Sequence, residues 1–246
     1  MARASATVDL HCHILPGIDD GARDLEDSVA MARQGEADGI REICATPHIR
    51  HDHDVRIHEL PERLDALSRA IERAGCRTRV LPGGEVAVSA LGGLDYAELH
   101  TVSLGGTGRW ILLEPAPGPL DDALDEAVER LRARGFRALI AHPERHLAPD
   151  LVQRLARLAR AGALVQATAA FFCREGTREG MLALAESGVI HVLGSDAHSS
   201  RAGRPVALTP ALEVLATVQR LAPHLEWIAR TAPEAIARGQ ELTPPF

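Results

Sequence analysis

The sequence predicts an α/β fold in the form of a seven-stranded (β/α) barrel that occupies a single domain, residues 1–246. The length suits one large domain, and single α/β barrels commonly reach this size. Short apolar segments alternate with helical stretches along the chain, which is the pattern of a parallel sheet or barrel. Most of these apolar segments are followed directly by a polar residue or by a turn of proline or glycine. An open doubly wound sheet is the alternative architecture.

The apolar segments place the strands, and the periodic stretches between them place the helices. Strands are expected at Thr7–His11, Glu42–Thr46, Arg79–Leu81, Trp110–Glu114, Ala138–Ala141, Leu164–Ala167 and Ile190–Leu193. Helices are expected at Leu25–Asp38, Glu59–Ala74, Leu120–Arg134, Asp150–Arg160, Arg178–Glu186, Pro210–Arg220 and Pro223–Ala237. Several helices end at a glycine, as helix C-termini often do, namely at Gly39, Gly75, Gly135, Gly162 and Gly188. The core would span about residues 7–208, with C-terminal helices over residues 209–238.

The composition is that of an ordinary globular protein, with 46% hydrophobic and 25% charged residues. The net charge is −7 and the basic residues are scattered, which argues against a nucleic-acid partner. No apolar run reaches the roughly 18 residues of a membrane span, and no signal-peptide core precedes the first strand, so we expect a cytoplasmic protein without membrane insertion. The four cysteines are widely spaced, which favours reduced thiols over a set of disulfides.

The first expected strand ends in two histidines one residue apart, His11 and His13, in the segment VDLHCH. Side chains alternate between the two faces of a strand, so these two imidazoles point the same way while Cys12 points the other way. Two imidazoles on one side of a strand end can bind the same metal ion. A single HxH motif is weak support for a metal site, and the interpretation depends on similar residues at other strand ends.

Residues of metal-ligand type follow six of the seven expected strands, and the carboxyl ends of parallel strands meet at one edge. These candidate metal ligands are His11, His13, His48, Glu85, Glu114, His142, Asp196 and His198. Imidazole and carboxylate ligands together suit zinc, iron or manganese. Eight ligands exceed the needs of one ion, so two or three ions with bridging carboxylates are expected. The sixth strand, in LVQATAA, offers no strong ligand.

Clustered divalent ions favour hydrolytic chemistry, and hydrolysis of a phosphate ester is the expected reaction. The anionic substrate requires cationic donors, and Arg145 would project from the same loop as His142. Arg204 and Arg201 are the next candidates, and the sequence alone leaves the choice between them open. Asp20 is preferred over Asp19 as a further ligand or as the acid that protonates the leaving oxygen.

A cysteine nucleophile is the competing interpretation, because Cys44 to Arg50 matches the CxxxxxR spacing of cysteine-dependent tyrosine phosphatases. Their loop needs small residues whose backbone amides surround the phosphate, and it needs a helix N-terminus that lowers the pKa of the thiol. Here Pro47 and His48 lie inside the loop and Cys44 lies within an expected strand. The sequence therefore disfavours this mechanism.

Two segments are expected to be loops. Residues 87–108 carry five glycines and would suit an irregular loop at the mouth of the fold. His51, His53 and His58 follow His48 closely and are expected in a solvated polar loop, from which one of them could reach a metal or the substrate.

Taken in order, the motifs DLHCHILPGIDDG, ATPH, PGGE, LLEP, AHPER and GSDAH resemble the polymerase and histidinol phosphatase (PHP) superfamily. More closely, they resemble the manganese-dependent bacterial protein-tyrosine phosphatases that act on capsule and exopolysaccharide tyrosine kinases. The resemblance extends from about Val8 to about Pro205, and HCHILPGIDDG together with HPER and GSDAH is highly specific.

This resemblance implies a distorted seven-stranded, PHP-like (β/α) barrel with three metal ions at the strand ends. Manganese is the preferred metal, with iron or zinc as alternatives. The implied ligands are the eight residues named above, and the implied phosphate-binding arginines are Arg145 and Arg204, with Asp20 near the leaving group. The segment after His48 and the interval from Asp196 to Arg204 differ from the family pattern, which leaves substrate choice and the second arginine open.

The sequence thus predicts a phosphomonoester hydrolase, with a protein-tyrosine phosphatase as the preferred interpretation. A metal-activated hydroxide would attack phosphorus without a cysteine nucleophile, and the partner would be a phosphotyrosine protein, a bacterial tyrosine kinase of polysaccharide biosynthesis. The alternatives are a small-molecule phosphatase, such as one acting on histidinol phosphate, and a metal-binding regulatory module without turnover. The oligomeric state stays open.

Overall fold

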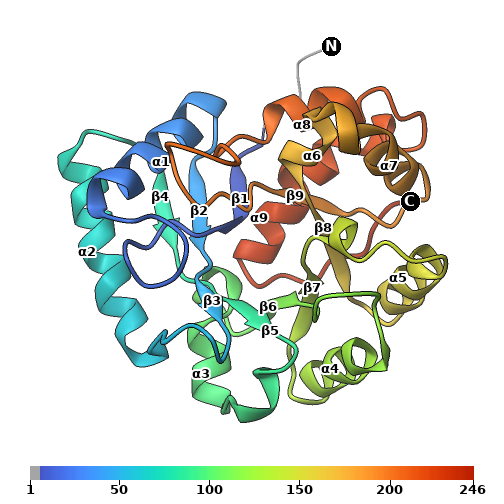
Figure 1. The fold of residues 1–246 in the computed structure, drawn as a ribbon, viewed down its shortest axis with the longest axis horizontal. Helices are drawn as coiled ribbons and strands as arrows, with labels where there is room; N and C mark the ends of the chain where they lie inside the picture. The colour runs from blue at the N-terminus through green and yellow to red at the C-terminus, as the bar shows by residue number, and fades with distance from the viewer. Residues whose placement is uncertain (1–5) are drawn as a thin grey trace.

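Parallel strands form a curled sheet with helices packed around it (Figure 1), in a computed structural model that describes residues 6–246. The strands are β1 (Val8–Cys12), β2 (Glu42–Ala45), β3 (His48–Ile49), β4 (Arg79–Leu81), β5 (Glu85–Ala87), β6 (Trp110–Glu114), β7 (Arg137–Ile140), β8 (Leu164–Thr168) and β9 (Val192–Gly194). They form one sheet in the order β1-β2-β4 and another in the order β3-β5-β6-β7-β8-β9. The protein is therefore a mixed α/β fold built on a curled parallel sheet.

The first and last strands lie side by side, which curls the sheet back on itself. The backbone N–H of Asp196 donates to the carbonyl of His11 over 2.8 Å, and the N–H of His13 donates to the carbonyl of Ala197 over 2.9 Å. The buried carboxylate of Asp9 accepts hydrogen bonds from the N–H groups of His11 and Ser195. The chain segments after β1 and β9 consequently lie next to each other at the carboxyl end of the sheet.

All seven expected strands are present, with ends that differ by at most two residues, but the expected count of strands is not confirmed. Residues 6–246 contain nine strands, because the chain passes from β2 to β3 through Pro47 and from β4 to β5 through Pro82 and two glycines. Proline lacks the N–H group that a central strand donates. Two of the expected strands are therefore each followed by a short further strand in the second sheet.

The helices are α1 (Leu25–Asp38), α2 (Leu60–Arg73), α3 (Tyr96–Thr101), α4 (Asp122–Ala133), α5 (Leu151–Arg160), α6 (Ala169–Cys173), α7 (Glu175–Glu186), α8 (Thr209–Leu215) and α9 (Ala232–Ala237). The expected helix at 223–237 is wrong as a single element. It divides into a 3₁₀ turn, a π-helical turn at Trp227–Thr231, and α9. No helix within residues 6–246 combines the length and the apolar character that crossing a membrane requires.

Helix α1 illustrates how the local sequence sets the ends of the helices. The Asp24 carboxylate accepts a hydrogen bond from the N–H of Asp27 over 2.8 Å and so caps the N-terminus. Gly39 ends the helix at a φ of 97°, where glycine avoids the steric cost that a Cβ atom would bring. The other four glycines expected at helix ends also have positive φ, so those sequence signals are confirmed.

The glycine-rich segment 87–108 is more regular than expected. It contains α3, whose start is fixed by a capping box between Asp95 and Glu98. The segment begins at the site end of β5 but returns to the opposite end of the sheet, where the N–H of Gly105 donates to the carbonyl of Pro82 over 2.9 Å. The expected position at the mouth of the fold is therefore correct only for its first residues.

Helix α9 packs against the end of the sheet opposite the polar strand ends. Ala232, Ile236 and Ala237 lie in one apolar cluster with Leu10 of β1 and Trp110 of β6. The Trp110 indole also donates to the carbonyl of Gln240 over 3.0 Å. The C-terminal helices are thus part of the core, and this apolar packing leaves the carboxyl ends of the strands as the polar end of the fold.

We predict that a side chain at Gly105 would destabilise the protein, because this residue lies against α9. A Cβ atom at Gly105, where φ is +71°, would overlap the carbonyl of Ala237, whereas one at Gly75, where φ is +69°, would meet nothing within 4 Å. Gly75→Ala is expected to lower the free energy of unfolding by about 1–2 kcal/mol, the cost of the left-handed conformation. Gly105→Ala is expected to lower it by about 1–3 kcal/mol more. Urea unfolding of the two variants measures this, and equal losses would show that the close approach to α9 is unimportant.

Candidate metal centre

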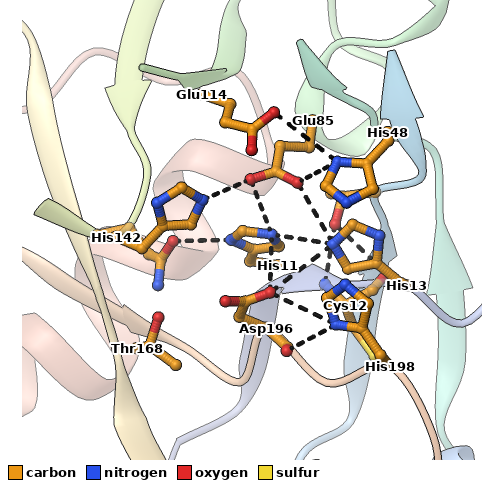
Figure 2. Close-up of polar contacts among 12 residues, drawn as sticks. His11, Cys12, His13, His48, Glu85, Glu114, His142, Thr168, Asp196 and His198 are labelled. Atoms are coloured by element: carbon orange, nitrogen blue, oxygen red, sulfur yellow. Dashed lines mark hydrogen bonds and ion pairs between the residues drawn. The ribbon is translucent and has the colours of Figure 1, made fainter. Parts of the chain in front are cut away.

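All eight predicted ligands lie together in one pocket at the carboxyl ends of the strands, and Figure 2 shows their side chains pointing toward one another. His11 belongs to β1, His48 to β3, Glu85 to β5 and Glu114 to β6. His13, His142, Asp196 and His198 stand in the segments directly after β1, β7 and β9. All of them are buried except His198, which is partly buried. The parallel topology thus brings together residues that are far apart in the chain.

Glu85 is the centre of this cluster. Its Oε1 lies 2.8 Å from Nε2 of His142 and 3.4 Å from Nε2 of His11. Its Oε2 lies 2.9 Å from Nδ1 of His48 and 3.4 Å from Nε2 of His13. One carboxylate with 1% exposure therefore touches four imidazoles, which is the position expected of a bridging ligand between metal ions.

Several nitrogen and oxygen atoms of the cluster lack hydrogen-bond partners but are placed to bind a metal ion. Nδ1 of His48 and Oε2 of Glu85 lie 2.9 Å apart, but neither makes a hydrogen bond, and Oε2 of Glu114 also has no hydrogen-bond partner. Buried polar atoms without partners are rare in folded proteins. The pocket contains three sets whose ligand atoms lie within 4.8 Å of one another: His11, His13 and Glu85; His48, Glu85 and Glu114; and His13, Asp20, His48 and His198. This mixture of imidazole and carboxylate suits zinc, iron or manganese.

Two residues that the sequence analysis did not assign orient the first two histidines. Nδ1 of His11 donates to Oε1 of Gln166 over 2.9 Å, and Nδ1 of His13 donates to Oδ2 of Asp19 over 2.9 Å. With their protons on Nδ1, both rings turn Nε2 toward the cluster, where the two nitrogens lie 3.3 Å apart. Outer partners of this kind orient ligand histidines in metal sites. The sixth expected strand therefore contributes to the site through Gln166, a polar residue within an otherwise apolar strand.

The electrostatics of the pocket hold the carboxylate of Glu85 ionised, whereas burial and the charge of Glu85 raise the pKa of Glu114. Burial opposes the charge of Glu85, but the neighbouring histidines outweigh it and hold the pKa of Glu85 well below its usual value. Burial opposes the charge of His13 as well, but hydrogen bonds to Asp19 and Glu85 raise the pKa of His13 to about 10. The protein without metal therefore keeps a proton on His13, and binding of a cation there would release it.

His142 and Asp196 are the only non-glycine residues with positive φ within residues 6–246, at 32° and 49°. Such conformations are costly for residues with a Cβ atom and are concentrated at functional sites. The turn after His142 continues as a 3₁₀ turn, Pro143–Arg145, which carries Arg145 to the same pocket. Both unusual residues are predicted ligands, which supports a functional origin for the strain.

Two of the candidate arginines reach the pocket. Arg145 pairs with Oδ2 of Asp196, and Nη2 of Arg204 lies 3.0 Å from Oδ1 of the same carboxylate. Nη2 of Arg201 instead lies 3.8 Å from Oδ2 of Asp24. A cavity of about 430 Å³ over the cluster is lined by Asp20, His48, Arg50, Glu114, Arg145, His198, Ala202, Gly203 and Arg204. Of the two candidates for the second phosphate-binding arginine, Arg204 and Arg201, the position of Arg204 is therefore the more favourable.

Asp20 and Arg50 form part of the wall of this cavity. Oδ1 of Asp20 lies 3.3 Å from Nε2 of His48 and 3.5 Å from Nε2 of His198, and its side chain is 59% exposed. Arg50 pairs with Asp52 and with Oε1 of Glu114, the latter over 3.3 Å. Asp20 is therefore accessible to a bound substrate, as its predicted role requires.

The cysteine mechanism does not fit the structure. Cys44 is fully buried in the apolar cluster beneath α9, and burial raises the pKa of its thiol to about 12. The Arg50 guanidinium, which this mechanism would place on the phosphate, pairs with Asp52 and Glu114 instead. The structure therefore agrees with the sequence in disfavouring Cys44 as the nucleophile.

The three histidines after His48 differ in their surroundings. His51 and His58 are exposed. His53 is partly buried and its ring stacks on that of His48, with a distance of 4.9 Å between the centroids. His53 is thus the member of this group that lies against the cluster.

The chain is similar to known proteins over most of its length. The family model for capsular polysaccharide synthesis, CpsB/CapC, matches residues 7–221. Tyrosine-protein phosphatase YwqE of Bacillus subtilis (strain 168) is 33% identical over 199 residues, which cover 78% of this chain and 77% of YwqE. CapC of Staphylococcus aureus is 27% identical over 201 residues, which cover 78% of this chain and 77% of CapC.

A crystal structure from work on YwqE of Bacillus subtilis and CpsB of Streptococcus pneumoniae, described as unique metal-dependent tyrosine phosphatases, has the same fold. It matches with a TM-score of 0.83 and 31% sequence identity over 96% of both chains. The resemblance found in the sequence motifs is thereby confirmed. The chain belongs to the CpsB/CapC family of capsular polysaccharide synthesis.

Proposed function

We propose that this protein is a metal-dependent tyrosine phosphatase that removes phosphate from a phosphotyrosine protein of capsular polysaccharide synthesis. The observation that carries the proposal is the Glu85 cluster with Arg145 and Arg204 on the wall of the same cavity. Its relatives named as tyrosine-protein phosphatases, and the solved metal-dependent phosphatases, support the same activity. These similarities favour it over a histidinol-phosphate phosphatase and over a regulatory module without turnover.

The eight residues predicted from the strand ends are proposed as the metal ligands, with Glu85 shared between ions. The three sets of donor atoms support a site for up to three ions, with manganese preferred and iron or zinc compatible. Bound divalent ions supply a strong nucleophile at neutral pH by lowering the pKa of water, and they neutralise charge on the phosphoryl group.

The remaining polar residues bind the substrate and hold protons. Arg145 and Arg204 approach Asp196 from the cavity wall, so their guanidinium groups are placed to bind phosphoryl oxygens beside the cluster. Asp20, whose carboxylate is accessible, is proposed to hold the proton that the leaving tyrosine oxygen takes. Gln166 and Asp19 keep the protons of His11 and His13 on Nδ1 and so leave Nε2 free.

The partner, the cellular compartment, the domain extent and the barrel form of the sheet remain predictions. The partner is proposed to be a bacterial tyrosine kinase of polysaccharide biosynthesis, with the reaction in the cytoplasm. Residues 1–246 are proposed to form one catalytic domain. If β2 with β3 and β4 with β5 are each counted as one interrupted strand, the curled sheet corresponds to a distorted seven-stranded barrel.

Removal of metal or of one ligand is expected to abolish activity. Wild-type protein should release phosphate from a phosphotyrosine peptide, lose this activity in a chelator and regain it with Mn²⁺. His142→Ala should lower kcat/KM by roughly 100-fold or more. Loss of a residue that only orients a ligand already costs about 10–100-fold, and loss of the ligand itself should cost at least as much. The exposed His58 provides the control, since His58→Ala should keep wild-type activity. Hydrolysis that is indifferent to chelation would refute the proposed mechanism.

Replacement of the cysteine is expected to leave the chemistry unchanged. Cys44→Ala should keep kcat and KM within about twofold of wild type, because the thiol lies in the apolar core and stays protonated. Alanine is used because serine would bury an unpaired hydroxyl group. A folded Cys44→Ala protein without activity would instead favour the cysteine mechanism.

The Gln166 side chain is expected to control metal affinity. Gln166→Leu removes the acceptor that keeps the His11 proton on Nδ1, and it should weaken Mn²⁺ binding by roughly 10–100-fold. Gln166→Glu keeps an acceptor at the same position and should retain most of the affinity. Competition with a chelating dye measures both, and equal Mn²⁺ affinity of wild type and the leucine variant would remove this role from Gln166.

A further inference from the structure

A small apolar pocket lies beside the metal cavity. It has a volume of about 210 Å³, and its walls are mainly apolar, with Leu147, Phe171, Met181 and Leu184. Glu144, Arg145 and Thr177 are the polar residues of its lining. Arg145 lines both this pocket and the metal cavity, so the two spaces adjoin at this side chain. The pocket lies between the 3₁₀ turn that carries Arg145 and helices α6 and α7, which pack together at one side of the sheet (Figure 1).

Two glycines of α7 keep this pocket open. Gly176 and Gly180 are four residues apart, so they lie on the same face of the helix. A Cβ atom at either position would meet nothing within 4 Å, and neither residue has a positive φ. Glycine within a helix costs about 1 kcal/mol relative to alanine. Both glycines are exposed, and neither backbone conformation nor close packing within this chain requires them, so a larger side chain at either position would occupy the open space.

The edge of the pocket is apolar and accessible. Leu147, two residues after Arg145, is 74% exposed and is among the few large apolar side chains that are exposed within residues 6–246. Phe171 is partly buried, and the guanidinium of Arg174 lies 5.2 Å from the centroid of its ring. Removing such a surface from water is favourable for an incoming apolar side chain.

The metal cavity offers no comparable surface, because apart from Ala202 and Gly203 its walls are charged or imidazole side chains. If Arg145 binds the phosphoryl group of a phosphotyrosine in that cavity, the polypeptide that continues past Arg145 would reach the apolar pocket. An extended chain advances about 3.4 Å per residue, so a side chain that reaches across one arginine lies within roughly three residues of the phosphotyrosine.

We propose that this pocket binds an apolar side chain of the phosphoprotein substrate, within three residues of the phosphotyrosine, and so contributes to substrate choice. The inference rests on the proposed phosphatase function and deepens it. A pocket of this size accepts a side chain such as leucine, and discrimination of about tenfold or more is typical of apolar pockets in enzymes.

The test uses phosphotyrosine heptapeptides of serine and glycine in which a single leucine is moved through the three positions on either side of the tyrosine. For metal-loaded wild-type protein, one leucine position should lower KM roughly tenfold relative to the leucine-free peptide. Gly180→Leu fills the pocket from a helix position with free space around it, and it should remove this advantage. Gly180→Ala should remove only part of it.

Ala183→Leu is the matched control, because it adds the same side chain to an exposed position of α7 that does not line the pocket. This control should keep the wild-type preference. Hydrolysis of para-nitrophenyl phosphate should be equal in all four proteins, which also shows that each variant is folded and loaded with metal. A wild-type protein that cannot hydrolyse para-nitrophenyl phosphate would refute the phosphatase function itself, and the docking inference with it.

Three results would overturn the docking inference alone. No leucine position lowers KM for wild type, or the advantage survives in Gly180→Leu, or Gly180→Leu loses activity toward para-nitrophenyl phosphate as strongly as toward the peptides. The last result would assign the pocket to the tyrosine ring or to the integrity of the site.

Discussion

The structure depends on one buried carboxylate, Glu85, that stays ionised among four histidines. Burying a charge is costly unless partners compensate for it, and here the partners come from β1, β3 and the turn after β7. Glu85 itself begins β5, directly after the interruption at Pro82, Gly83 and Gly84. A Cβ atom at Gly84 would lie 2.8 Å from that of Val102, so this interruption also requires glycine. Glu85 therefore stands at the first residue of a strand that follows an interruption in which glycine is required.

The two ends of the sheet differ in polarity, and the apolar end stabilises the fold against the cost of the polar end. At one end, α9 and apolar residues of the strands form a cluster that contributes burial without polar groups. At the other end, carboxylates and imidazoles are held close together, with several buried atoms that lack hydrogen-bond partners. Such a polar cluster costs stability in the absence of metal. The strained backbone of His142 and Asp196 adds to this cost, and the apolar end offsets it.

The ligands could be predicted from the sequence because the rule behind them is topological. Parallel strands end at the same edge, so polar residues at or just after the apolar segments that were expected as strands come together there. Helix ends at Gly39 and Gly75 were predictable because a left-handed cap is a local requirement. The role of Gln166 was not predictable, because it depends on a contact with His11, which is distant in the chain. The interruptions at Pro47 and Pro82 and the short helix α3 have local signals in proline and in a capping box, but these signals were not used. Position alone likewise separates Arg204 from Arg201, since both stand in the same loop of the sequence.

The central claim is that Glu85 bridges metal ions that the surrounding histidines bind. Anomalous X-ray diffraction from crystals prepared with Mn²⁺ tests it most directly, because the ions themselves give the signal. At least two strong anomalous peaks are expected at ligand distance from the Glu85 carboxylate, one of them also at ligand distance from His11 and His13 and another from His48. A crystal saturated with Mn²⁺ that shows no peak at ligand distance from Glu85 would contradict it.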